Sequence, residues 1–307
     1  MFVMNSKALN RKMDMLLAKE LAGELSHSKK SRTLRKLHAN KLAVIGTGIF
    51  LVILILCIFA PLFTSFSSTD VDLRNRLSPP GSVHILGTDQ IGRDIWARIL
   101  YGGRVSILVG MGSALGATLI GVSLGTYAGY KGGFLDATIM KTSELFMSFP
   151  QIILVLILVT ITGQSLWNII FIFVLTGWPS MYRMTRSQML SIREEEYVQA
   201  LKAFGIHDLL IAFKHMLPNA IGPIFVNITL STAMFILQES ALSFLGLGVP
   251  SNVSTWGNVL SPAQNITILR ENWWIWLPVG GVLTTFVLAI NFIGDGLRDA
   301  ADPTQIG

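Results

Sequence analysis

The residue types that most often carry out enzyme chemistry are few and scattered in this 307-residue chain. Its histidines stand at positions 27, 38, 84, 207 and 215, with no pair four residues apart and no carboxylate cluster beside them to complete a metal site. The single cysteine, Cys57, excludes a disulfide within the chain and a cysteine-based metal cluster. No Gly-x-x-x-x-Gly-Lys-Ser/Thr phosphate loop occurs, so ATP would have to bind to another protein. We therefore predict no catalytic residue, no metal site and no cofactor bound by this chain.

The main concentration of polar residues lies at 194–219, EEEYVQALKAFGIHDLLIAFKHMLPN, between two apolar stretches. Apolar residues recur there at helical spacing on each side of Gly205, at Tyr197, Leu201 and Phe204 before it and at Leu209, Phe213 and Met216 after it. This pattern predicts two short helices, each with an apolar face, joined by a bend or a positive φ at Gly205. A displayed amphipathic helix can lie on lipid or insert into the groove of a partner. The run of three glutamates at 194–196 would be repelled by anionic headgroups, which favours a protein partner.

The elements that must position this polar insert are predicted to be membrane helices. Hydrophobic residues make up 51% of the chain and charged residues only 14%, with a mean hydropathy of +0.56, whereas soluble domains carry about 25% charged residues. Stretches long enough to span a bilayer occur at about 42–64, 104–128, 138–162, 167–189, 219–245 and 273–295. Only a short turn separates the third stretch from the fourth, which predicts an antiparallel hairpin. The sequence thus predicts an all-α integral membrane protein with six transmembrane helices.

The distribution of basic residues predicts the orientation of these helices. Ten of the 24 lysines and arginines precede residue 42, where a basic segment more often sets membrane topology than binds nucleic acid. With the N-terminus inside, eighteen basic residues lie in inner segments and six in outer segments. We therefore expect both termini to be cytoplasmic. The predicted parts begin with a basic cytoplasmic segment that contains an amphipathic helix (1–41), the first transmembrane helix (42–64) and an extracellular loop (65–103). A core of five transmembrane helices with a polar loop at 190–218 follows (104–298), and a cytoplasmic tail ends the sequence (299–307).

A glycine stripe marks the second predicted transmembrane helix. It consists of Gly112, Gly116, Gly121, Gly125 and Gly129, of which the last three repeat every fourth residue and so share one helix face. Small residues on one face allow another helix to approach closely, so we expect these glycines to serve helix packing.

The polar insert resembles the cytoplasmic loop signature of ABC importer permeases. That signature is Glu-Ala-Ala, three residues, Gly, nine residues, Ile, one residue and Leu-Pro. Ala200, Gly205 and Leu217-Pro218 match it with the full spacing. The identities differ at three positions, filled here by Gln199, Leu201 and His215.

Three further stretches are similar to the second permease subunit of the dipeptide, oligopeptide and nickel branch of that family. They are HILGTDQIGRDIWARILYGGRVSILVG at 84–110, ESALSFLGLGVP at 239–250 and FIGDGLRDAADP at 292–303. The resemblance extends over about residues 32–303.

The resemblance implies a type I ABC importer permease fold in a bacterial cytoplasmic membrane, surrounded by lipid. It also implies a homologous permease that completes one path, two cytoplasmic ATPase subunits that hold ATP and Mg²⁺, and an extracellular substrate-binding lipoprotein; nucleic acid is not an implied partner. In this fold the insert is a coupling helix seated in a cleft of an ATPase subunit. The residues expected to form or support that contact are Glu196, Tyr197, Ala200, Leu201, Phe204, Gly205, Ile206, His207 and Asp208.

The cargo implied by the resemblance is a peptide, and a nickel complex or another small solute is the alternative. A secondary transporter is a more distant alternative, since it would need coupling-ion residues near the bilayer midplane and usually an inverted repeat, neither of which is evident. Gln238 and Glu239 are candidates for the translocation path or outer gate, because a carboxylate within a membrane usually faces a partner or a cavity. The other interpretation of Glu239 is a hydrogen bond that ties helix ends together.

Overall fold

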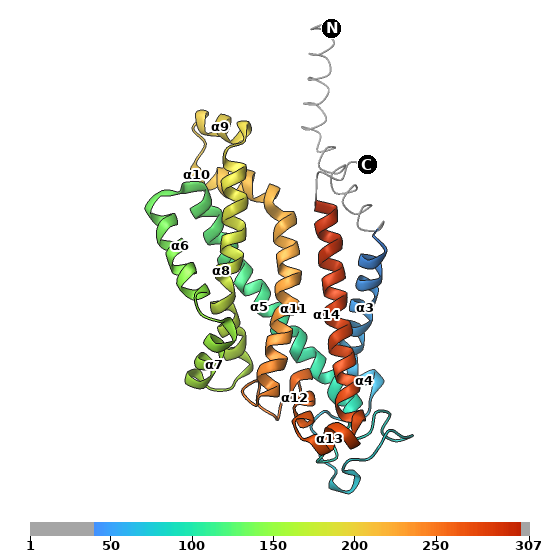
Figure 1. The fold of residues 1–307 in the computed structure, drawn as a ribbon. Helices are drawn as coiled ribbons and strands as arrows, with labels where there is room; N and C mark the ends of the chain where they lie inside the picture. The colour runs from blue at the N-terminus through green and yellow to red at the C-terminus, as the bar shows by residue number, and fades with distance from the viewer. Residues whose placement is uncertain (1–39, 302–307) are drawn as a thin grey trace.

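The computed structural model describes residues 40–301, which form helices joined by loops (Figure 1). The longer helices are α3 (Lys41–Ile58), α5 (Ile95–Lys131), α6 (Gly133–Met147), α7 (Gln151–Thr162), α8 (Leu166–Arg193), α11 (Ile221–Phe244) and α14 (Trp273–Ala301). The shorter ones are α4 (Ala60–Phe63), η1 (Leu73–Asn75), α9 (Glu196–Ala203), α10 (Asp208–Leu210), the π-helical η2 (Ile211–Met216), η3 (Leu217–Ala220), α12 (Trp256–Leu260), η4 (Ser261–Gln264) and α13 (Ile266–Glu271). The amphipathic helix predicted near the N-terminus and most of the predicted tail lie outside the described residues.

Within residues 40–301, four helical stretches are long and apolar enough to cross a membrane, namely 41–58, 95–131, 208–244 and 273–300. The pair of α6 and α7 passes the same test together as a broken span. The fourth predicted stretch, 167–189, falls in α8, which is long enough at 28 residues but carries arginines along its second half. The structure therefore contains four or five candidate spans by length and composition.

The third predicted span, 138–162, is wrong as one straight helix. It is divided at Ser148–Pro150 into α6 and α7, which are bent by 86° relative to each other. The break follows from Pro150, which lacks an N–H and disfavours the helical conformation in the residue before it. The turn at 163–165 joins α7 to α8, and these two helices are in contact.

The second predicted span is longer than expected. Residues 95–103, expected within the extracellular loop, are continuous with it, so α5 has 37 residues. The Asp94 side chain begins this helix by accepting a hydrogen bond from the Ala97 N–H at 2.7 Å. In Figure 1, α5 runs obliquely across the whole molecule, from the end that carries the loop after α4 to the end that carries α9.

The glycine stripe of α5 lies against α8. A Cβ added at Gly121 would lie 2.8 Å from both Trp178 O and Tyr182 N, and Gly125 and Gly129 approach the α8 backbone similarly closely. Gly116 faces the Val174 side chain, whereas Gly112 has no neighbour closer than Ile170 at 4.0 Å. The contact between α5 and α8 is therefore close from Gly121 to Gly129 and looser at Gly112.

The first and last long helices, α3 and α14, lie side by side (Figure 1). Gly46 lies against the backbone of Ala289, and the rings of Phe50 and Phe286 are 5.4 Å apart. One end of the molecule carries α9, α10 and the turn between α5 and α6, and the opposite end carries the loop after α4 together with α12 and α13 (Figure 1). The two candidate sites of the sequence, the polar insert and Glu239, therefore lie in different parts of the fold.

Candidate functional site

The polar insert is two short helical segments joined by a turn at Gly205. Gly205 has φ +73°, the left-handed conformation that glycine adopts without strain. The Ile206 N–H donates to Leu201 O at 3.2 Å and the Gly205 N–H to Lys202 O at 2.9 Å, the paired bonds of a Schellman helix end. His207 then begins the second segment, because its Nδ1 accepts a hydrogen bond from the Leu209 N–H at 3.3 Å.

The insert packs onto the helix bundle through a small apolar cluster. Its buried members from the insert are Val198, Ile211, Ala212 and Met216, which lie with residues of α5, α8 and α11, and Leu201 and Ile206 pack at its edge. The periodicity of the sequence predicted the helices correctly but did not identify the buried side. Of the six residues at helical spacing, Tyr197, Phe204, Leu209 and Phe213 are exposed instead.

The outward face of the insert is apolar at its tip. The Phe204 side chain is 83% exposed, and Tyr197 is 39% exposed. Among the residues expected to contact a partner, Glu196, Tyr197, Ala200, Phe204, Gly205 and His207 are exposed, whereas Leu201, Ile206 and Asp208 are partly buried. The turn therefore presents an unpartnered phenyl ring at one end of the molecule.

Asp208 binds to other residues of the same chain. Its carboxylate accepts hydrogen bonds from Tyr130 Oη and Lys131 Nζ, each at 2.8 Å, and the Lys202 ammonium lies 5.1 Å from the centre of the Tyr130 ring. These contacts join the insert to the last turn of α5. Sequence reasoning missed them, because a separation of 78 residues between Tyr130 and Asp208 leaves no periodic signal.

Glu239 is fully buried and hydrogen-bonded. Its carboxylate accepts from Ser243 Oγ at 2.7 Å and from Ser106 Oγ at 3.2 Å, and Ser106 Oγ accepts in turn from the Trp256 N–H at 3.1 Å. This arrangement joins α11, α5 and α12, which favours the interpretation of Glu239 as a tie between helix ends.

Gln238 belongs to a different polar group. Its Nε2 donates to Gln151 Oε1 at 3.1 Å, and Gln151 Nε2 donates to Thr176 Oγ1 at 3.4 Å, so that α11, α7 and α8 are linked at the α6–α7 break. The Oε1 atom of Gln238 is buried without a hydrogen-bond partner among the described residues.

The loop between α4 and α5 is held by buried charges. Asp89 Oδ2 accepts hydrogen bonds from Arg93 Nε and Arg98 NH1, each at 2.7 Å, and both Asp89 and Arg98 are 1% exposed. Asp94 pairs with His84 Nδ1 at 2.8 Å. The charged groups of the GTDQIGRD stretch therefore brace this loop against the start of α5.

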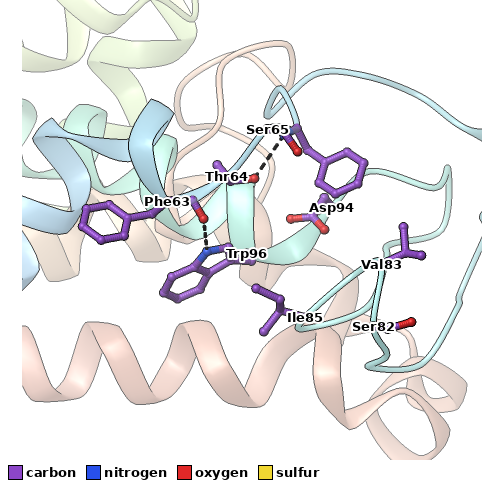
Figure 2. A pocket seen from close by; sticks show the side chains of 9 residues that line it. Phe63, Thr64, Ser65, Ser82, Val83, Ile85, Asp94 and Trp96 are labelled. Atoms are coloured by element: carbon purple, nitrogen blue, oxygen red, sulfur yellow. Dashed lines mark hydrogen bonds between the residues drawn. The ribbon is translucent and has the colours of Figure 1, made fainter.

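The surface of the same loop carries a small pocket next to the end of α4 (Figure 2). Its volume is about 170 Å³, and Trp96 Nε1 closes one side by donating to Phe63 O at 3.1 Å. Nearby, hydrogen bonds from the Asn75 side chain and the Arg74 backbone N–H hold the pKa of the Asp72 carboxyl below its ordinary value. Within the described residues no group of three or more His, Cys, Asp or Glu side chains is arranged to hold a metal ion.

Comparison with known proteins gives two family matches. Residues 121–306 match the binding-protein-dependent transport system inner membrane component, and residues 30–80 match the N-terminal TM domain of oligopeptide transport permease C.

Individual relatives resemble the chain along most of its length. The dipeptide transport system permease protein DppC of Alkalihalophilus pseudofirmus is 41% identical over 269 residues, which cover 88% of each chain. The oligopeptide transport system permease protein OppC of Bacillus subtilis is 37% identical over 281 residues, covering 90% of this chain and 92% of that protein. DppC of Bacillus subtilis is 40% identical over 270 residues, covering 88% and 84%. The chain is thus an all-helical, multi-pass inner-membrane protein that belongs to the family of binding-protein-dependent transport system inner membrane components.

Proposed function

We propose that this chain is a transmembrane permease subunit of an ATP-driven importer that takes up dipeptides or oligopeptides delivered by a binding protein. The observation that carries the proposal is the similarity to DppC and OppC over about nine-tenths of the chain, together with the OppC-type N-terminal match at residues 30–80. A homologous permease completes the translocation path. Two ATPase subunits bind ATP and Mg²⁺ and hydrolyse the ATP, and this chain is not itself an enzyme.

The proposed topology has six spans in a bacterial cytoplasmic membrane, with both termini in the cytoplasm. The spans are α3, α5, the broken pair α6–α7, α8, the stretch 208–244 and α14. The excess of basic residues in the inner segments supports this orientation. The α9 end of the molecule then faces the cytoplasm, and the loop between α4 and α5 faces the binding protein.

The polar insert is the proposed contact with an ATPase subunit. Its support is geometric: Phe204 is 83% exposed at the tip of a turn whose base is packed onto the bundle. An exposed aromatic ring on an ordered turn is suited to a hydrophobic groove of a partner. Movement of the ATPase subunits around ATP would then be transmitted through the insert to the spans.

Reconstitution of the chain with its partner permease, ATPase subunits and binding protein in proteoliposomes tests the proposed function. We expect ATP-dependent uptake of short peptides, and no uptake of nickel chelates. Uptake of a nickel chelate or another small solute in place of peptides would show that the cargo assignment is wrong. Solute uptake by this chain without the ATPase subunits would instead show a secondary transporter.

The variant Phe204→Asp tests the coupling contact in the same system, because it would place a charge in the partner's apolar groove. We expect it to insert normally into the membrane but to lose association with the ATPase subunits, whereas Phe204→Leu, which keeps an apolar side chain, should retain most of the association. Normal assembly and uptake with Phe204→Asp would contradict the assignment.

A further inference from the structure

The α6–α7 break carries charged side chains on a surface that the rest of this chain leaves uncovered. On α6, Lys141 and Glu144 are exposed, and Ser148 is exposed in the break itself. Neither charged side chain forms an ion pair within residues 40–301. They differ in this from Asp136, the one other charged residue of α6 and α7.

Asp136 gives the contrast on the same helix. It faces α8, where Arg186 binds both of its carboxylate oxygens at 2.5 Å and Tyr182 Oη donates to it at 3.0 Å. The inward side of α6 is thus a satisfied ion pair that fastens the helix to its neighbour. The charges of Lys141 and Glu144 do not contribute to that packing.

The break lies at a depth where uncovered charge is costly. Gln151 follows the break directly, and its Nε2 donates to Thr176, ten residues into α8. Ten helical residues span about 15 Å, which is about half of a hydrocarbon core of about 30 Å. Glu144 lies three residues before the end of α6, or about 5 Å from the break.

Charged side chains at this depth face a partner or a water-filled cavity, and irregular backbone is tolerated there only where it is buried in protein or lines such a cavity. Lipid is therefore a costly neighbour for these charged side chains. Because broken helices near the bilayer midplane are a recurring element of transporter substrate sites, the cavity is the better explanation.

We propose that the outward face of the α6–α7 break, formed by Lys141, Glu144 and Ser148, lines the translocation path and contacts the peptide in transit. This inference rests on the proposed function. A free peptide carries an ammonium group at one end, a carboxylate at the other and amides between them. Glu144 complements the ammonium group and Lys141 the carboxylate.

Arg183 adds a second cation close to this face. It is exposed on α8, and its NH1 lies 3.5 Å from Sδ of Met147, the last residue of α6. The charges around the break thus have both signs, as recognition of a zwitterion requires.

Thiol accessibility in the assembled importer tests this inference. In a Cys57→Ser background, Glu144→Cys and Ser148→Cys would be treated with a membrane-impermeant cationic methanethiosulfonate reagent. Val52→Cys is the matched control, since Val52 is 57% exposed on the apolar helix α3. Because the reagent reacts in water, we expect labelling at positions 144 and 148 to be at least about tenfold faster than at position 52, and to slow when peptide-loaded binding protein and a non-hydrolysable ATP analogue are present.

Each other result contradicts the inference in a distinct way. Slow labelling at both positions, with a crosslink from position 144 to the partner permease, would make this face a subunit interface. Fast labelling that peptide leaves unchanged, in an importer that does take up peptide, would show a wet face that the cargo does not touch. Failure of the proposed function is separate, because it appears as an unmodified importer that takes up no peptide.

Discussion

Gly205 has a backbone conformation that most other residues adopt only with strain, and the space around it is open. Its φ is +73°, and an added Cβ would have no neighbour within 4 Å. A side chain at this position would therefore meet no clash within the chain, and its cost would come from the left-handed backbone alone, about 1–2 kcal/mol for most residues. Any larger effect on transport would report on the contact that the turn makes with its partner.

Replacement of Gly205 should therefore follow backbone preference first. We expect Gly205→Asn, which tolerates the left-handed region, to keep most peptide uptake, and Gly205→Val, which resists it, to abolish uptake in the reconstituted importer. Gly163→Val is the control, because Gly163 has φ +83° and equally open surroundings in the turn between α7 and α8. If both valine variants lose uptake equally, backbone strain and not the insert explains the loss.

At the scale of elements, the close contact of α5 with α8 depends on individual glycines to different degrees. A Cβ at Gly121 would lie 2.8 Å from backbone atoms of α8, whereas at Gly112 the nearest atom is the end of the Ile170 side chain at 4.0 Å. The backbone at Gly121 cannot yield without moving one helix. The two positions therefore form a matched pair on one helix.

We expect Gly121→Ala to destabilise the bundle by about 1–3 kcal/mol, as overpacked sites do, and Gly112→Ala to change stability by much less. The measurement is thermal unfolding of the purified chain in detergent, followed by the loss of the monodisperse peak on size-exclusion chromatography. Equal stability of the two variants would mean that α5 and α8 separate more easily than their contact implies.

The insert is joined to α5 by an exposed ion pair, in which the Lys131 and Asp208 side chains are 52% and 44% exposed. Such pairs contribute about 0–1 kcal/mol to stability, so their main effect here is to fix the position of Asp208 relative to α5.

Lys131→Asp should leave the fold intact and should weaken the stimulation of ATP turnover by loaded binding protein, because two carboxylates would then repel. The charge-exchanged double variant Lys131→Asp/Asp208→Lys should recover part of the stimulation. A double variant as impaired as the single one would indicate that Asp208 contacts the ATPase subunit directly.

Sequence patterns predict the elements well where one physical signal dominates. The length of the apolar stretch predicts the last span at 273–295, and the observed helix is Trp273–Ala301. The glycines of α5 indicate the part of this helix that lies on another helix. The break at Pro150 was not predicted, because the apolar residues that follow it extend the apolar stretch and made 138–162 look like a single span. The buried side of the insert was also missed, since apolar residues such as Val198 and Phe204 occur on both sides and only the tertiary structure selects between them. Contacts between distant segments, such as Tyr130 with Asp208, have no local signal at all.

At the scale of the whole molecule, its two ends differ in what holds them together. At the α9 end, the insert is packed through the apolar cluster of Val198, Ile211 and Met216, and the tip of the turn remains exposed. At the opposite end, the loop before α5 is held by the buried pair of Asp89 with Arg98. One continuous helix, α5, reaches both ends, from the loop after α4 to the end that carries the insert (Figure 1).

The sidedness of these two ends is the last prediction. Ser82 is exposed in the loop between α4 and α5, and Ala203 is exposed in the insert. In a Cys57→Ser background, an impermeant maleimide should label Ser82→Cys in intact cells, and should label Ala203→Cys only after the membrane is permeabilised. We expect this result because basic residues concentrate in the segments predicted to lie on the same side of the membrane as the α9 end, and such segments are usually cytoplasmic. Cys57 is removed because it is the only thiol of the chain, although it is buried. Labelling of both positions from the same side would require an even number of spans between them, in which case either the broken pair α6–α7 or α8 would not cross the membrane.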